Sequence, residues 1–187
     1  MIDVKRSFLT ISMLKDWKNL EIADTEYDAV FGVRYSCTEI EPKGYSIIIN
    51  NTDSSIKLLL FGSFIPRIND SLILEANRLV FLLDDIVYAV DRFSGTLLSE
   101  NEIRDGGQLF AIYPFDGGYI IHGEMEIIKL SDDFKEQWSF SGRDIFVHPI
   151  ERECFKIKNN KIELSDFQGN NYTLNQTGNC IYDSKGK

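Results

Sequence analysis

Short apolar stretches alternate with polar turn residues along most of this chain. The clearest example is VYAVDRFSGTLL at residues 87–98. Residues 87–90 are small or β-favouring, as a buried strand requires, and Asp91 and Gly95 are typical of turns. Gly adopts a positive φ without steric cost, and Asp can accept hydrogen bonds from the turn that follows it. The pattern therefore predicts a strand, a tight turn and a return strand.

Two weaker copies of this stretch follow at successive offsets of 40 and 34 residues. They read IKLSDDFKEQW at residues 128–138 and IELSDFQGNNY at residues 162–172. Gly95 aligns with Gly169, whereas Lys135 occupies this position in the middle copy. A strand-like stretch also precedes each copy, so each unit is predicted to contain three strands joined by two turns. These preceding stretches are residues 79–83, 119–123 and 153–157.

This repeat resembles a known structural family. Repeats of about 40 residues that contain four strands are typical of β-propeller blades. VYAVDRFSGTLL is similar to the "lyAldxxtGxxlW" blade motif of quinoprotein-type β-propellers, and Trp138 lies near the position of the Trp in that motif. The resemblance covers residues 71–172 and implies blades. It implies no quinone cofactor, because no residues match the calcium and ring ligands of that cofactor.

The first 70 residues contain further predicted strands. Two of them, residues 45–50 and 56–64, flank the hairpin signal NTDSS. Apolar stretches at residues 8–14 and 29–36 also have strand-like patterns, and residues 66–71 (PRINDS) are a candidate junction. We therefore expect N-terminal β-strands over residues 1–70 and three blade-like repeats over residues 71–187, in one compact domain.

The overall prediction is an all-β fold in which antiparallel meander repeats form a small or partial β-propeller. Three blades do not close a ring, since propellers usually have four or more. The N-terminal strands are expected to complete the array as degenerate blades or as a cap over its open edge. Self-association through that edge is the alternative.

Composition restricts the class of protein further. The chain has 187 residues and three Cys, an odd number that argues against a disulfide framework and for a reducing compartment. It contains no run of about 18 apolar residues that could span a membrane. The N-terminal segment lacks the small-residue cleavage site of a signal peptide, so we expect a cytoplasmic location.

The net charge of −9 disfavours a nucleic-acid partner, and most of it comes from one region. Residues 84–136 contain 12 acids and 4 bases. If strands follow one another in a meander, the turn before residue 86 and the loop after residue 99 lie at the same end of the sheet. The corresponding turn of the next repeat is also acidic. This predicts an acidic face that binds a partner through Asp84, Asp85, Glu100, Glu102, Asp105, Glu124 and Glu126.

Candidate catalytic chemistry is sparse. His122 lies in a predicted strand and is expected to be a hydrogen-bonded structural group, while Cys154 is expected to be a small buried hydrophobe. The Cys and His spacing matches no zinc pattern, and the sequence contains no phosphate-binding glycine loop and no nucleophile elbow. We therefore expect no cofactor and no bound metal.

Three functions remain open. The first is a non-enzymatic protein-binding module whose acidic face captures a basic protein, as do immunity proteins that neutralise bacterial toxins; this chain is similar to them in size and charge. Trp17 and Trp138 are candidate aromatic anchors, and a position in the core is the favoured alternative for Trp138. The second is a hydrolase or carbohydrate-binding module with a carboxylate-lined pocket. The third is a structural subunit that associates with itself through an open sheet edge.

Overall fold

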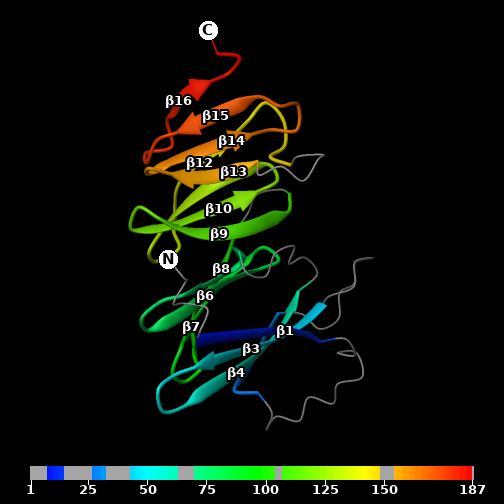
Figure 1. Ribbon diagram of the computed structural model, residues 1–187, viewed down its shortest axis with the longest axis vertical. Helices are drawn as coiled ribbons and strands as arrows, with labels where there is room; N and C mark the ends of the chain where they lie inside the picture. The colour runs from blue at the N-terminus through cyan, green and yellow to red at the C-terminus, as the bar shows by residue number, and fades with distance from the viewer. Residues whose placement is uncertain are drawn as a thin grey trace. The chain divides into compact units, whose positions relative to one another are not determined.

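The computed structural model describes residues 8–14, 27–32, 43–62, 70–103, 107–147 and 154–186. Within these residues the chain forms four four-stranded β-sheets and no α-helix (Figure 1). It divides into two compact units, Met1–Ile103 and Arg104–Lys187, here called unit 1 and unit 2. Each unit contains two of the sheets.

Unit 1 combines a rearranged sheet with a regular meander. The first sheet has the strand order β1-β3-β4-β2, and β2 runs parallel to β4 while the other pairs are antiparallel. The second sheet follows chain order, β5-β6-β7-β8, and is antiparallel throughout. The strands are β1 (Leu9–Leu14), β2 (Ala29–Gly32), β3 (Lys43–Asn50), β4 (Ser55–Gly62), β5 (Leu72–Leu74), β6 (Arg78–Leu83), β7 (Ile86–Asp91) and β8 (Leu97–Glu102).

Unit 2 contains two regular meanders. Both sheets follow chain order and all their strand pairs are antiparallel. The third sheet of the chain has β9 (Leu109–Phe115), β10 (Gly118–Gly123), β11 (Glu126–Ser131) and β12 (Glu136–Ser141), and the fourth has β13 (Phe155–Lys158), β14 (Lys161–Ser165), β15 (Asn171–Leu174) and β16 (Cys180–Asp183).

The predicted all-β fold of antiparallel meander repeats is confirmed. The second, third and fourth sheets have the strand number and the chain order of propeller blades, and the first sheet adds a rearranged blade built from the N-terminal strands. The fold class is therefore that of a partial β-propeller. The predicted boundary at residue 70 and the prediction of one compact domain remain predictions.

The third copy of the repeat lies one strand later in its sheet than the sequence alignment predicted. The alignment matched β14, the second strand of its sheet, to β7 and β11. Those two strands are the third strands of their sheets, so their structural counterpart in the fourth sheet is β15. These three strands share an irregularity of register directly before the turn into the last strand. It falls between Ala89 and Val90, between Lys129 and Leu130, and between Thr173 and Leu174. The turns after β14 and β15 both contain a positive-φ glycine, Gly169 and Gly178, so the residue pattern alone could not separate them.

In the middle copy Lys135 aligns with Gly95 because this turn is one residue shorter than the turn of the first copy. In the first copy the Asp91 N–H donates to Thr96 O, whereas in the middle copy the Ser131 N–H donates to Lys135 O, one residue earlier. The left-handed position of the middle copy is therefore occupied by Phe134, with φ of 62°, and not by Lys135. The departure at Lys135 is a difference in turn length.

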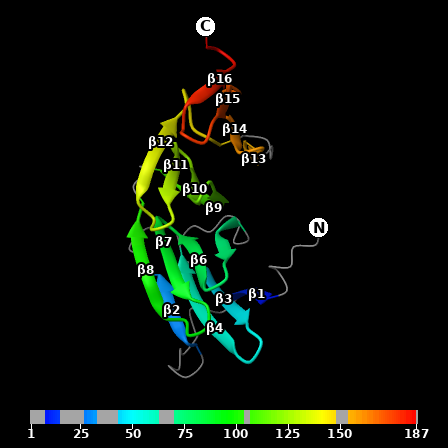
Figure 2. The ribbon, with the colours of Figure 1, turned by 90° about the vertical axis from the view of Figure 1, so that its left-hand side faces the viewer.

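The core of unit 1 lies between its two sheets (Figure 2). Residues two apart in a strand point to the same face, which explains why alternate side chains of β3, β4, β6 and β7 are buried together. The rings of Phe31, Phe81 and Tyr88 meet at its centre, and each contacts the other two at centroid distances of 5.1–5.5 Å. The buried aliphatic residues include Ile47, Ile49, Leu58, Leu60, Leu79 and Leu83.

The turn between β7 and β8 fastens the second sheet to the first. The Asp91 carboxylate accepts two backbone N–H groups of this turn. Arg92 donates to Asn51 Oδ1 at 3.1 Å, and the Asn51 side chain donates back to Arg92 O at 3.0 Å. A Cβ on Gly95 (φ +73°) would lie 3.1 Å from a methyl carbon of Ile56. The turn within residues 87–98 therefore links the two sheets of unit 1.

Unit 2 is packed by aromatic side chains of β12. The Trp138 indole N–H donates to Gln176 O at 3.1 Å, and its ring covers Gly178 in the turn between β15 and β16. Phe140 meets the Tyr172 ring edge-on at a centroid distance of 5.5 Å. Trp138 is therefore part of the internal packing of this unit.

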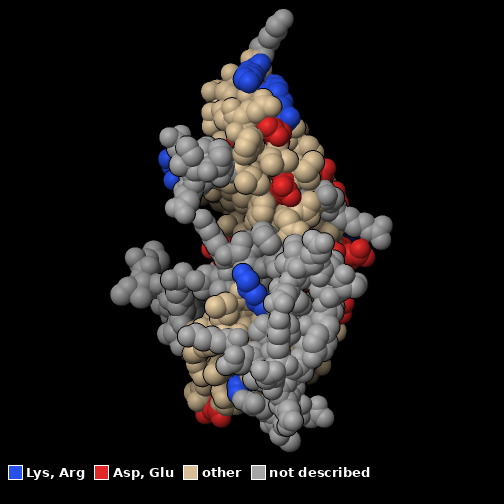
Figure 3. Space-filling model, turned by 90° about the vertical axis from the view of Figure 1, so that its right-hand side faces the viewer, with Lys and Arg blue, Asp and Glu red and all other residues tan. Residues whose placement is uncertain are grey.

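The fourth sheet has one apolar and one polar face. Ile162, Leu164 and Leu174 are buried in the core of unit 2. On the opposite face a row of polar side chains crosses the four strands, because these residues are directly paired. The row consists of Lys156, Glu163, Thr173 and Tyr182. Figure 3 shows basic side chains gathered at the C-terminal end of this unit.

Candidate functional site

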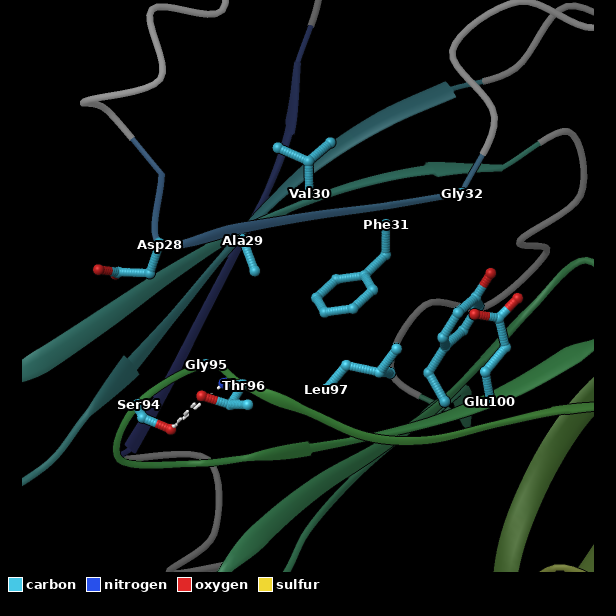
Figure 4. Close-up of a pocket in the computed structure, with 11 residues that line it drawn as sticks. Asp28, Ala29, Val30, Phe31, Gly32, Ser94, Gly95, Thr96, Leu97 and Glu100 are labelled. Atoms are coloured by element: carbon cyan, nitrogen blue, oxygen red, sulfur yellow. Dashed lines mark hydrogen bonds between the residues drawn. The ribbon is translucent and has the colours of Figure 1, made fainter.

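A cavity of about 440 Å³ opens in unit 1 between β2 of the first sheet and β7 and β8 of the second (Figure 4). Both β2 and β8 are edge strands. Phe31 points into the cavity from β2, and Leu97 approaches it from β8, whereas Val30 points away (Figure 4). The lining residues are Asp28, Ala29, Val30, Phe31, Gly32, Tyr88, Ser94, Gly95, Thr96, Leu97 and Glu100.

Small side chains on β2 explain why this space is open. In unit 2 the last strand of the third sheet, β12, carries Trp138 and Phe140, which pack against the fourth sheet. In unit 1 the corresponding edge strand of the first sheet is β2, which offers Ala29 and Phe31. A single ring in place of two leaves the outer part of the space between the sheets unfilled.

Backbone and side-chain contacts fix one wall of the cavity. Asp28 Oδ2 accepts the Lys57 N–H at 2.7 Å, and the Asp28 N–H donates to Lys57 O at 2.8 Å, so the start of β2 is tied to β4. At the other end of β2, Gly32 has φ of +81° and a Cβ there would overlap Phe61 O. Only glycine permits this close approach of the two strands.

Tyr88 joins the cavity to the acidic residues around it. It is only 5% exposed, and its ring stacks on Phe81. Burial raises the pKa of the Tyr88 phenol to about 12, and the negative charges of Glu100, Asp84 and Asp85 add to this rise. The phenol is therefore neutral at pH 7, and the carboxylates make the surroundings of the cavity negative.

Four of the predicted partner-binding residues lie at one end of the second sheet. Asp84 and Asp85 form the turn between β6 and β7, with Asp84 at φ of 54°. Asp85 O accepts the Ile103 N–H at 2.7 Å, directly after β8. Glu102 is paired with the first residue of β7, and Glu100 is opposite Tyr88. We call Asp84, Asp85, Glu100 and Glu102 the acidic end of unit 1.

The remaining predicted partner-binding residues are Asp105, Glu124 and Glu126. Asp105 lies outside the described residues. Glu124 and Glu126 belong to unit 2, at the turn between β10 and β11. Glu124 accepts the Gln108 N–H at 3.3 Å, and Glu126 accepts the Ser141 hydroxyl at 3.0 Å. Both therefore take part in hydrogen bonds within their own sheet, and their binding role remains a prediction.

His122 and Cys154 are placed as structural groups. The His122 ring is stacked on Phe155 at a centroid distance of 4.9 Å, and its Nε2 lies 3.2 Å from Phe146 O. Cys154 is half-buried and not fully buried as predicted, and its thiol donates to the same carbonyl at 3.4 Å. The part of the chain that the structure describes contains no group of three or more His, Cys, Asp or Glu that could hold a metal ion. Cys37, His148 and Trp17 lie outside that part.

The cavity itself was not predicted from the sequence. Its two walls come from β2 and β8, which are far apart in the chain and belong to different sheets. The signal that could have indicated it is Tyr88, an aromatic residue in a strand that is directly followed by the patterned turn. Among the described residues, no helix has the length and apolarity needed to span a membrane.

Comparisons with known proteins show no family. No family model matches the chain, and no curated protein matches it. Among solved structures, the crystal structure of BamB from Moraxella catarrhalis is similar over 57% of this chain and 34% of that chain, with 11% sequence identity and a TM-score of 0.45. The chain therefore spans about a third of the length of that structure. The fold assignment rests on the strand order and pairing described above.

Proposed function

We propose that this chain is a non-enzymatic protein-binding module of the cytoplasm that uses the acidic end of unit 1 to bind a basic protein. The observation that carries the proposal is the gathering of four carboxylates around one turn and one edge strand, beside an open cavity. Complementary charge speeds the encounter of two proteins and orients them. Asp85, Glu100 and Glu102 are exposed, so a partner can reach them.

The geometry favours binding over hydrolysis. A glycoside hydrolase needs two carboxylates that face each other across the substrate. Two carboxylates line the cavity, but Asp28 is already held by the Lys57 N–H. Glu100 is the lining carboxylate that accepts no hydrogen bond from another described residue.

A bacterial toxin is the partner class that we propose. Small acidic immunity proteins neutralise toxins, many of which are basic nucleases, and the size and net charge of this chain are similar to theirs. Binding of this kind depends on charge, so it should weaken as salt screens the interaction.

The test compares two variants that lose equal charge. One replaces the acidic end (Asp84→Asn, Asp85→Asn, Glu100→Gln and Glu102→Gln). The control replaces four exposed acids elsewhere (Asp53→Asn, Asp132→Asn, Glu136→Gln and Glu163→Gln). Asn keeps the positive φ of Asp84 accessible.

The variants and the wild type are immobilised and exposed to lysate of the cells that produce the protein, at low and at high salt. We expect the wild type and the control to retain the same basic protein at low salt and to lose it at high salt. The acidic-end variant should not retain it. Equal loss by both variants would show a general charge effect and would reject the acidic end as the binding site.

A further inference from the structure

We propose that the cavity of unit 1 binds an arginine side chain of the partner protein. This inference rests on the proposed function and adds the group that the site recognises. It follows from Glu100, which lines a cavity together with the apolar residues Ala29, Phe31 and Leu97 (Figure 4), and from Tyr88, which also lines it and is paired with Glu100.

The size and the walls of the cavity suit a long side chain with an apolar stem. Its volume of about 440 Å³ falls in the usual range of ligand pockets. Ala29, Phe31 and Leu97 form apolar walls, and Leu97 is 46% exposed. Arginine buries its methylene groups along such surfaces while its charged head remains near polar groups. The burial of Leu97 beneath this stem adds to the binding energy.

The charge of the lining calls for a cation. Asp28 and Glu100 are the charged residues among those that line the cavity, and both are acidic. The other three carboxylates of the acidic end stand at the same end as Glu100. A positively charged group is therefore stabilised there and an anion is repelled.

The polar groups at this end fit a guanidinium better than an ammonium. A guanidinium presents five N–H donors in one plane and can bind a carboxylate through two of them. Glu100 supplies the carboxylate. The Tyr88 hydroxyl, which makes no hydrogen bond among the described residues, can accept a further N–H. Lysine presents a compact, strongly hydrated charge that matches this pair of acceptors less well.

Two basic residues in the described part of unit 1, Arg92 and Lys57, have partners of their own. Arg92 donates to Asn51 Oδ1 and to Glu75 O, on the side of the β7–β8 turn away from the acidic end. The Lys57 ammonium lies 4.5 Å above the Tyr27 ring. Neither of these two residues is among those that line the cavity beside Asp28 and Glu100.

The test uses a short peptide of defined sequence. Acetyl-Gly-Arg-Gly-amide is titrated into isotopically labelled protein and followed by amide NMR shifts, beside the matched peptides with lysine and with citrulline. Citrulline has nearly the shape of arginine without its charge. We expect the arginine peptide to shift the amides of Ala29, Gly95, Leu97 and Glu100 and to bind at least about five-fold more tightly than either matched peptide.

Two variants separate the cavity from the general charge. Ala29→Leu narrows the cavity and leaves the acidic end unchanged, whereas Glu100→Gln removes one of the two carboxylates that line it. Each should weaken binding of the arginine peptide by about ten-fold or more. Asp53→Asn is the control, because it removes one exposed charge outside both the lining and the acidic end, and it should change the affinity less than two-fold, by screening.

Several results would overturn the inference. The first is equal binding of the citrulline or the lysine peptide, and the second is a set of shifts confined to residues outside the cavity. The third is unchanged affinity in Glu100→Gln, a variant that can be measured even if Ala29→Leu does not fold. None of these results would affect the proposed function, because the charge-matched capture experiment tests it separately. Conversely, loss of capture in both charge variants would reject the acidic end and leave the peptide titration valid.

Discussion

Replacing Gly178 by alanine tests how the fourth sheet is fitted against the third. Gly178 has φ of +78°, and a Cβ there would lie 2.6–2.9 Å from three carbon atoms of the Trp138 ring. Gly169 has nearly the same φ of +81° in the preceding turn, but a Cβ at that position meets no atom within 4 Å. Gly169→Ala is therefore a matched control that carries the backbone cost without the contact.

The expected magnitudes follow from these two terms. A left-handed φ costs a non-glycine residue about 1–2 kcal/mol, so Gly169→Ala should lose about that much free energy of unfolding. Forcing a methyl group into a packed ring adds about 1–3 kcal/mol. Gly178→Ala should therefore lose about 2–5 kcal/mol. The Trp138 ring cannot move freely, because its N–H donates to Gln176 O.

The assay is urea unfolding followed by far-UV circular dichroism, with tryptophan fluorescence as a second probe. A double-mutant cycle with Trp138→Leu isolates the contact, since the extra cost of Gly178→Ala should disappear when the ring is absent. If the two alanine variants lose equal free energy, or if the extra cost persists without the ring, the close packing of Trp138 on this turn is refuted.

Three further predictions concern titratable groups. Burial lowers the pKa of Lys129, which is 1% exposed, so the free energy of unfolding should rise as pH increases towards 10.5. In urea titrations, Lys129→Met should add about 1 kcal/mol to this free energy at pH 7 and should abolish its rise with pH. The pKa of Tyr88 is raised to about 12, so stability should fall as pH rises from about 10 to about 12; phenolate absorbance should show a lower Tyr88 pKa in Glu100→Gln. Hydrogen bonds from Arg143, and further ones from backbone N–H groups such as that of Lys185, lower the pKa of Asp183 from 3.8 to about 2. Thermal unfolding should therefore show stability lost as pH falls through this interval, and Arg143→Gln should reduce that loss.

The repeat could be predicted because its signals are local. Alternation of apolar and polar residues sets the strands, and a turn with Asp91 or Gly95 is specified within a few residues. The same locality explains the misplaced third copy. Asp166 and Asn175 each begin a turn of equal length that ends in a left-handed glycine, so only the register shift in β15 distinguishes them.

The cavity could not be predicted because it depends on pairing between distant segments. β2 joins β4 as a parallel edge strand, with β3 lying between them in the sequence. No short-range pattern indicates that Ala29 will face Leu97 across two sheets. By contrast, the acidic end was predictable in part, since Asp85 and Glu102 are brought together by the simple meander of β6, β7 and β8.

The polar row on the fourth sheet has a consequence for assembly. A further blade stacked on this face would have to remove Lys156 and Glu163 from water, and such desolvation opposes association. Repeat arrays commonly end in a unit whose outer surface is hydrophilic, because that surface stops the addition of more units. The charged members of the polar row therefore oppose the stacking of another sheet on this face.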